Sequence, residues 1–234
     1  RGDGDDEECG GPYKDHPKKE HICGRPLGLS FNIASGQLYV ADAYMGLVVI
    51  EPNGGTARKI TSHAIEGEPL AFTNSLDIDQ RTGAVYFTSS SSKYQRRNYV
   101  SLILSGDKSG KLIKYEPKSE QVTILLNNLT FANGVALSKD GNYILIAETT
   151  NCRILRYWLQ TSKAGTLEVF ANLPGSSGLA IRLSEEGDVL EIVEDHRSGI
   201  RRSISDIEEK DGVLWVGSVD APFALMYNTL VAQE

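Results

Sequence analysis

Residues 131–158 read FANGVALSKDGNYILIAETTNCRILRYW, and this stretch decides the fold. A short apolar run, 133–138, precedes the dipeptide Asp140-Gly141, and an alternating apolar run, 142–148, follows it. Asp-Gly between two such runs is typical of a tight turn that joins two antiparallel strands. The stretch therefore predicts a β-hairpin, and the run 154–158 predicts a third strand.

The same hairpin pattern recurs from residue 27 onward. Its expected turns are Ser35-Gly36, Thr82-Gly83, Asp140-Gly141, Glu186-Gly187 and Asp211-Gly212. Counted from Gly28, Ser75, Gly134 and Gly178, successive units are 47, 59 and 44 residues apart. Repeats of roughly 40–50 residues suit four-stranded propeller blades. We therefore predict an all-β fold, a β-propeller of four-stranded antiparallel blades. A β-sandwich is the alternative, although its strands need not repeat as similar units.

The fourth unit lacks an expected strand. The segment 170–175, FANLPG, leads directly into Ser176, where a blade needs its innermost strand. Either the propeller is incomplete, or a segment is missing between Gly175 and Ser176. We therefore expect an acidic arm over residues 1–24 and propeller blades over residues 25–234, with this break inside them.

Length and composition bound the class of protein. The 234 residues suit one domain or two small ones, and 40% hydrophobic with 24% charged residues is ordinary for a globular protein. No apolar run approaches the roughly 18 residues of a membrane-spanning helix. The formal charge of −7, without basic clusters, argues against nucleic acid and anionic membranes as partners. The chain starts at Arg1 without a methionine or an apolar leader, as a mature or trimmed protein would.

Three cysteines bear on the cellular compartment. Cys9 and Cys23 bracket a polar segment, and a disulfide between them would close a loop of about 15 residues and stabilise the protein by roughly 3 kcal/mol. The alternative is a metal site that adds His16 and His21, although this spacing matches no standard zinc module. Cys152 lies in a strand-like run and is expected to be a buried free thiol.

A glycosylation sequon points to the same compartment as the paired cysteines. Asn128-Leu129-Thr130 is the only sequence of this kind in the chain, and it lies between two predicted strands. Together, these signs favour the secretory pathway.

Several motifs resemble those of the plant strictosidine synthase family, and more closely its strictosidine synthase-like members than the alkaloid-forming enzyme. They occur in order at 23–28 (CGRPLG), 80–87 (QRTGAVYF), 110–115 (GKLIKY), 131–158 and 208–212 (EEKDG). The resemblance implies a six-bladed propeller, a disulfide at the Cys9 and Cys23 positions, a small-molecule ligand at the propeller centre, and a secretory location, vacuolar or extracellular. It also implies residues upstream of Arg1 and a further stretch after Gly175.

The resemblance also bears on catalysis. The catalytic glutamate of the alkaloid-forming enzyme falls at the position held here by Ser205. Condensation of an amine with an aldehyde needs a base at this position, and a serine hydroxyl is far too weak a base near neutral pH. Ser205 is not expected to be a nucleophile either, because no histidine follows in a usable context. We therefore expect a polar strand residue here and no strictosidine-forming activity.

The wider superfamily includes calcium-dependent lactonases and phosphotriesterases built on the same propeller. Their metal is held by side chains at the starts of innermost strands, and Asn74 and Asn133 match two of those positions. Amide oxygens are hard, neutral ligands for Ca²⁺, whereas the alternative is a turn asparagine that caps local backbone. Two such oxygens do not hold calcium alone, so the other ligands are expected in the absent segments. Leu27 stands where lactonases have their histidine base.

Other polar residues are candidates for lesser roles. Asp42, Glu148 and Asp220 end or follow strands and would rim a central pocket, or else are strand-end charges that face water. The four histidines are expected in surface loops: His16, His21, His63 and His196.

Three functions are consistent with these residues. The first is a hydrolase of small esters or lactones with a central Ca²⁺, which requires the absent segments. The second is a non-catalytic propeller that binds a small apolar or glycosylated ligand, or a protein partner, because Ser205 and Leu27 replace catalytic side chains. The third, condensation of tryptamine with an aldehyde, agrees least with the sequence.

Overall fold

The structure of the protein is a computed structural model that describes residues 9, 16–61, 67–173, 179–184, 186–194, 204–210, 213–218 and 225–228. The chain divides into two compact units, residues 1–172 and 173–234, and each is considered separately. The predicted break between Gly175 and Ser176 lies outside the described residues.

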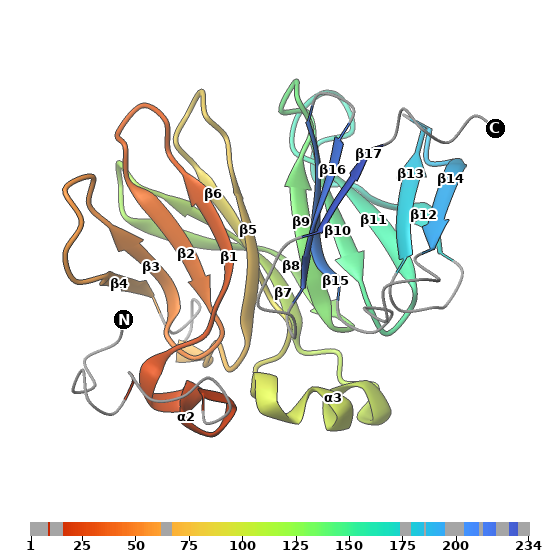
Figure 1. The fold of residues 1–234 in the computed structure, drawn as a ribbon. Coiled ribbons are helices and arrows are strands. Elements are labelled where there is room, and N and C mark those ends of the chain that lie inside the picture. Colours follow the sequence, from red (N-terminus) through yellow and green to blue (C-terminus); the bar gives the residue numbers. More distant parts are fainter. Residues whose placement is uncertain are drawn as a thin grey trace. The chain divides into compact units, whose positions relative to one another are not determined.

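The first unit contains three four-stranded antiparallel sheets (Figure 1). The first sheet is formed by β1 (Pro26–Phe31), β2 (Leu38–Asp42), β3 (Gly46–Ile50) and β4 (Arg58–Thr61). The second is formed by β5 (Thr73–Ile78), β6 (Val85–Ser89), β7 (Gly110–Glu116) and β8 (Gln121–Leu129). The third is formed by β9 (Ala132–Leu137), β10 (Tyr143–Glu148), β11 (Arg153–Trp158) and β12 (Leu167–Asn172). Strands pair in chain order within every sheet, which is the construction of propeller blades and confirms the predicted fold class.

The turn at Asp140-Gly141 shows why the strands reverse where the sequence predicts. Gly141 has a φ of 72°, which glycine adopts without strain. The Asp140 carboxylate accepts hydrogen bonds from the Ser138 hydroxyl at 2.7 Å and from the backbone N–H of Asn142 at 3.0 Å. These bonds close the turn that joins β9 to β10.

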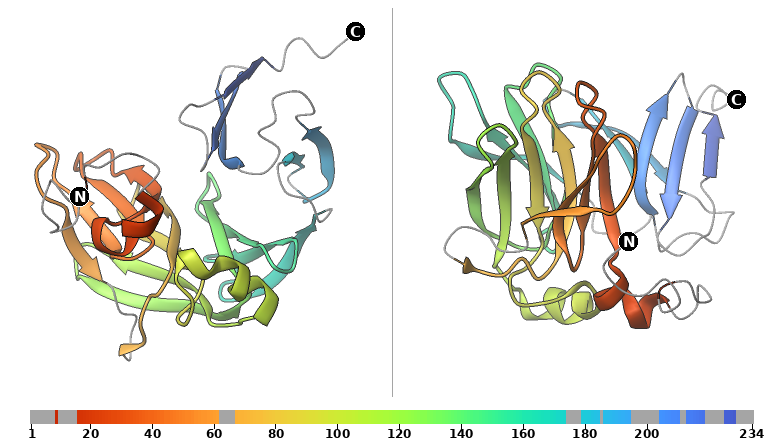
Figure 2. Two further views of the ribbon diagram at one scale, coloured as in Figure 1. Left: turned by 60° about the horizontal axis from the view of Figure 1, so that its bottom comes forward. Right: turned by 90° about the vertical axis from the view of Figure 1, so that its left-hand side faces the viewer.

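The middle blade contributes side chains to two cores at once. Successive residues of a strand point to opposite faces of the sheet. Accordingly, Val85 and Phe87 of β6 pack into the core shared with the first blade, whereas Tyr86 packs into the core shared with the third. The three sheets therefore stack face to face, with their innermost strands β1, β5 and β9 as successive neighbours (Figure 2).

The first two innermost strands approach each other most closely at Gly28 of β1. A Cβ atom placed on Gly28 would lie 2.8 Å from the backbone nitrogen of Leu76 and 2.8 Å from the Cα of Ser75. Real Cβ atoms do not come this close to backbone, so only glycine allows the two strands to pack at this distance.

The second unit contains two smaller antiparallel sheets. Strands β13 (Leu179–Leu183) and β14 (Val189–Glu194) form a hairpin, and β15 (Ile204–Lys210), β16 (Val213–Ser218) and β17 (Leu225–Asn228) form a three-stranded sheet. Both hairpins predicted for this part of the chain are confirmed.

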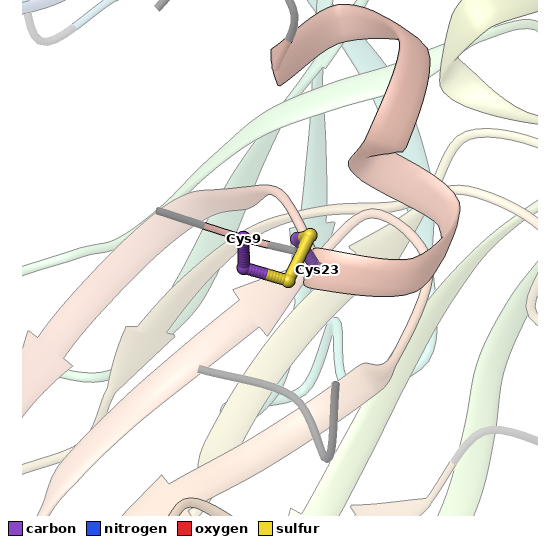
Figure 3. Close-up of a disulfide and its surroundings, with 2 residues drawn as sticks. All are labelled: Cys9 and Cys23. Atoms are coloured by element: carbon purple, nitrogen blue, oxygen red, sulfur yellow. A yellow bond between two sulfur atoms is a disulfide. The ribbon is translucent and has the colours of Figure 1, made fainter. Parts of the chain in front are cut away.

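Three helices that the structure describes lie in the arm and in one insertion. The helix α2 (His16–Cys23) belongs to the arm, whereas η3 (Arg96–Asn98) and α3 (Tyr99–Ser105) lie between β6 and β7. Cys9 and Cys23 form a disulfide (Figure 3), which confirms the predicted bridge and leaves neither thiol for the alternative metal site. Within the described ranges, no helix is long and apolar enough to cross a membrane.

A buried carboxylate ties the arm to the insertion. Glu20 of α2 accepts a hydrogen bond from Arg96 Nη1 at 2.8 Å and another from the Tyr44 hydroxyl at 3.0 Å. Tyr44 follows β2, so these bonds connect α2, η3 and the first blade. A buried charge requires such pairing, because an isolated one would be costly to remove from water.

The prediction that Cys152 is buried is wrong, whereas the expected free thiol is confirmed. The residue is exposed and free, and it lies in the turn between β10 and β11 with a φ of 47°. Its backbone N–H donates to the carbonyl of Thr149 at 3.1 Å, which closes that turn. The apolar residues on both sides suggested one continuous strand, but the chain reverses between them.

We expect the substitution Gly28→Ala to lower the free energy of unfolding by about 1–3 kcal/mol, because the added methyl group would push β1 away from β5. The matched control is Gly134→Ala in β9, where a Cβ atom would meet only the Ala147 Cβ at 3.9 Å, an ordinary contact. Urea denaturation of both variants measures the difference. Equal stability of the two variants would contradict this account of the close approach.

Candidate functional site

Each innermost strand of the three blades begins with an irregularity in its pairing. Asn74 and Ser75 of β5 lie between the pairs Thr73–Ser89 and Leu76–Phe87, so two residues oppose one on β6. The pairing of β9 with β10 is irregular at the equivalent place, around Asn133 and Gly134. The first blade has its irregularity at Leu27, between Pro26 and Gly28. Such a bulge changes the direction of a side chain and is frequent near functional sites.

The second unit repeats this feature in β15. Its pairing with β16 shifts between Ile204 and Asp206, so Ser205 is the extra residue. The structure therefore places Leu27, Asn74, Asn133 and Ser205 at corresponding irregular positions of their strands. The side chain of Ser205 lies outside the described part of the structure.

The two asparagines are held in the same way. Asn74 Nδ2 donates to the Ser90 hydroxyl at 2.9 Å, and Asn133 Nδ2 donates to the Thr149 hydroxyl at 3.1 Å. In each case the acceptor lies 16 residues further along the chain. Among the residues that the structure describes, none donates a hydrogen bond to either Oδ1. Each carboxamide is therefore oriented through its nitrogen.

Hydroxyl groups at the end of β6 connect the two asparagine positions. Ser90 donates from its hydroxyl to the carbonyl of Ala132 at 2.7 Å, and Thr88 donates to the carbonyl of Asn133 at 2.6 Å. Thr88 also accepts the backbone N–H of Ser75 at 3.1 Å. One network of hydrogen bonds thus joins the second and third blades and brings the neighbourhoods of Asn74 and Asn133 together.

The same end of the blades carries an apolar cluster. Phe72 and Phe131 precede the two bulges, and their ring centroids are 5.7 Å apart. Leu102 of α3 is fully buried against them, and Leu27 packs onto this cluster. The insertion α3 therefore lies beside the starts of the innermost strands, where apolar and amide groups occur next to each other.

Asp42 and Glu148 are both buried, 4% and 2% exposed, so the alternative that they face water is wrong. Asp42 Oδ1 accepts the backbone N–H groups of Tyr44 and Met45, each at 2.9 Å, and so holds the turn after β2. A carboxylate engaged in this way is a structural group. Asp220, the third candidate for the pocket rim, lies outside the described residues.

Glu148 is the most heavily hydrogen-bonded of these carboxylates. It accepts from the backbone N–H of Thr130 at 2.8 Å, from Asn151 Nδ2 at 2.9 Å and from Arg153 Nε at 2.5 Å. Burial alone would raise its pKa, but these hydrogen bonds outweigh burial and hold the pKa below the ordinary value of 4.5. Glu148 is therefore ionised at neutral pH and serves to fix the third blade.

The described residues do not form a complete calcium site. Calcium takes six to eight oxygen ligands, usually with several carboxylates. Asn74 and Asn133 supply two neutral oxygens, while Asp42 and Glu148 are engaged elsewhere. No group of three or more His, Cys, Asp or Glu side chains suited to a metal occurs within the part of the chain that the structure describes. The residues present would bind a cation only with further ligands.

Two of the remaining predicted residues have described side chains, Asn128 and His21. Asn128 is exposed at the end of β8, and His21 is exposed as expected. The prediction of a loop is wrong for His16 and His21, because both belong to the helix α2. His63 and His196, together with the side chain of His16, lie outside the described residues.

Sequence reasoning missed the hydroxyl partners Thr88, Ser90 and Thr149. A signal for Ser90 and Thr149 existed in the sequence, because each follows its asparagine, Asn74 or Asn133, by 16 residues. Thr73, next to Asn74, was missed as well: its hydroxyl is buried and has no hydrogen-bond partner among the described atoms.

We expect Glu148→Gln to lower the free energy of unfolding by about 1–3 kcal/mol at pH 7, since a buried charged acceptor is lost. The pKa of Glu148 is depressed in the folded state, so its contribution is present above pH 4.5 and is lost as pH falls below that value. The difference between wild type and variant should therefore narrow on acidification. Denaturation at pH 7 and pH 3.5 measures this, with Glu120→Gln as the exposed control. A difference that stays constant with pH would contradict the assignment.

Comparison with known proteins places these features in a family. The family model described as strictosidine synthase matches residues 74–162, from the second residue of β5 to beyond the end of β11. Two Arabidopsis thaliana proteins match most of the chain. Strictosidine synthase-like 10 is 42% identical over 278 residues, with 95% of this chain and 74% of the relative covered. Strictosidine synthase-like 2 is 44% identical over 285 residues, with 95% and 75% covered.

Solved structures support the fold. A gluconolactonase from Xanthomonas campestris aligns with a TM-score of 0.65 at 14% identity, covering 86% of this chain and 71% of the other. A chain of a nidogen–laminin complex aligns with a TM-score of 0.61 at 11% identity, covering 89% and 77%. Identities this low indicate a shared propeller architecture alone. The extensive match to the two Arabidopsis proteins shows more: the chain belongs to the strictosidine synthase-like family.

Proposed function

We propose that this protein hydrolyses small esters or lactones at the end of the blades where the innermost strands begin. The observation that supports this most is the pair Asn74 and Asn133, two oriented carboxamides at the same bulged position of successive blades. Their oxygens suit a hard cation such as Ca²⁺ as two of its ligands. When bound, a cation of this kind would polarise a carbonyl group.

The condensation of an amine with an aldehyde agrees poorly with this site. That reaction needs a general base, and the family glutamate is replaced by Ser205 in β15. A serine hydroxyl does not take a proton near pH 7 without a partner base. The proposed chemistry is therefore hydrolytic, in keeping with a fold shared with a gluconolactonase.

The remaining calcium ligands would come from residues that this chain lacks. The matches to the two Arabidopsis relatives extend over 278 and 285 residues, more than the 234 residues present here. The relatives therefore have residues within the matched range that have no counterpart in this chain. We place the missing segment between Gly175 and Ser176, where the sequence lacks an innermost strand.

A non-catalytic role is the second candidate. Leu27 occupies the bulge of β1, and it packs on the apolar cluster of Phe72, Phe131 and Leu102. An apolar side chain at this position favours binding of an apolar small molecule over proton transfer. Under this alternative, the propeller centre binds a ligand and does not convert it.

A secretory location, vacuolar or extracellular, belongs to the same proposal. The Cys9–Cys23 disulfide is of the kind that persists in oxidising compartments. Asn128 is exposed, as an N-glycosylated asparagine must be.

The intact mass of the purified protein, after removal of any N-glycan, tests whether residues are missing. We expect a mass clearly above the 25.6 kDa of this sequence, because a complete calcium site requires more chain. A mass near 25.6 kDa would count against the calcium site and favour the binding alternative.

Hydrolysis of an aryl ester and of a lactone, measured with and without a calcium chelator, tests the activity itself. We expect the chelator to abolish turnover, and Asn133→Ala to lower kcat/KM at least about tenfold, because a ligand of the cation is lost. The control is Asn53→Ala, which removes an exposed carboxamide from a turn of the first blade. Turnover unaffected by both chelator and Asn133→Ala would refute the proposal. Saturable ligand binding without turnover would select the non-catalytic role.

A further inference from the structure

A pocket lies on the middle blade, lined by residues that follow β6, by the start of β7 and by the end of β8. It has a volume of about 540 Å³ and is open to solvent. We call this cavity the cationic pocket. Its charged and hydroxyl-bearing lining residues are Glu68, Ser92, Lys93, Lys108, Ser109 and Lys111. With three lysines and one glutamate, its lining is positive on a chain whose formal charge is −7.

The central feature of the cationic pocket is Lys111 of β7. Its side chain is only 6% exposed, yet it carries an ammonium group. Lys111 Nζ lies 2.7 Å from Glu68 Oε2, and it donates to the carbonyl of Ser109 at 3.3 Å. Burying a charge is costly unless an opposite charge compensates it. The site is therefore built to keep an anion beside Lys111.

In the structure, the anion beside Lys111 is the carboxylate of Glu68. Glu68 is 56% exposed, so its carboxylate reaches into the pocket from solvent. The hydrogen bond and charge of Lys111 lower the pKa of Glu68, so it is ionised at neutral pH. Glu68 is the exposed partner of the pair, so its side chain can turn towards solvent, provided that another anion compensates the buried charge of Lys111. Another anion can thus take its place.

Two further ammonium groups line the cationic pocket. Lys93 is 71% exposed, and its Nζ lies 3.6 Å from Asp107 Oδ1. Lys108 is exposed and makes no hydrogen bond or ion pair with the residues that the structure describes. Asp107 itself is buried and accepts hydrogen bonds from the hydroxyls of Ser91 and Ser109 at 2.9 and 2.5 Å. These bonds fix the segment from which Lys93 and Lys108 extend.

We propose that the cationic pocket binds the phosphate or sulfate group of a small molecule, which displaces Glu68 from Lys111. A tetrahedral dianion matches the positive charge left in the lining after Glu68 turns away, since three lysines then face one ligand. A phosphate monoester carries a charge of about −1.5 to −2 at pH 7 and offers three acceptor oxygens. Ammonium groups are effective phosphate ligands as point charges. The hydroxyl of Ser92 and the carboxamides of Asn127 and Asn128 in the lining add neutral donors.

Inorganic phosphate is the probe for the test. Its binding is measured by isothermal titration, and by the shift in thermal midpoint, against sodium chloride of equal ionic strength. The protein is produced without glycosylation, because Asn128 also borders the pocket. We expect saturable binding of phosphate and not of chloride. Lys108→Gln should weaken it about tenfold, since one charge-assisted hydrogen bond is lost.

Two further variants separate this proposal from general attraction of anions. Glu68→Gln should tighten phosphate binding, because the internal competitor no longer occupies Lys111. Lys139→Gln removes the same charge from an exposed hairpin of the third blade and should leave affinity unchanged. A sulfate titration shows which group is preferred, and saturable binding of either one supports the site. Thermal midpoints without phosphate confirm that the variants fold. The proposal is overturned if phosphate acts no differently from chloride, or if Lys108→Gln and Lys139→Gln have equal effects.

Discussion

The middle blade of the first unit buries both faces of its sheet, and the packing of the neighbouring blades depends on this constraint. In the middle blade, all five residues of β6 are buried, because Val85 and Phe87 enter one core and Tyr86 the other. A charged side chain in the centre of such a strand would lose its water on either face. Polar residues are therefore found at the strand ends, where Thr88 and Ser90 meet the next blade.

The bulges and these polar strand ends are joined by hydrogen bonds. A bulge interrupts the ladder of hydrogen bonds, and carbonyl groups near it need other donors. At the third blade, the carbonyls of Ala132 and Asn133 obtain them from Ser90 and Thr88 of the second blade. Ser90 also orients the carboxamide of Asn74. The groups that hold the blades together are thus also those that present the candidate ligands, which is why the site and the blade interface share residues.

The connection between β6 and β7 serves both functional regions. Ser90, at the beginning of this connection, accepts a hydrogen bond from Asn74. Leu102 of α3 is buried against Phe72 and Phe131. Lys93 and Lys108, further along, line the cationic pocket. Substitutions in such a connection can change the chemistry of the surface without a change of fold, because the strands of the blade form the scaffold and the loop carries the polar groups.

The sequence by itself determined the strands, their turns and the repeat. Alternation of apolar residues has a period of two only in a strand, and Asp140-Gly141 suits a tight turn by local chemistry alone. It also showed that Asn74 and Asn133 are equivalent, because the repeat aligns them. Only the tertiary structure decided what surrounds each residue. Cys152 proved exposed, Glu148 proved to be held by Thr130 and Arg153, and Lys111 proved to be buried. The contacts of Glu148 with Thr130 and of Lys111 with Glu68 join residues far apart in the chain, and local pattern carries no information on which distant groups will meet.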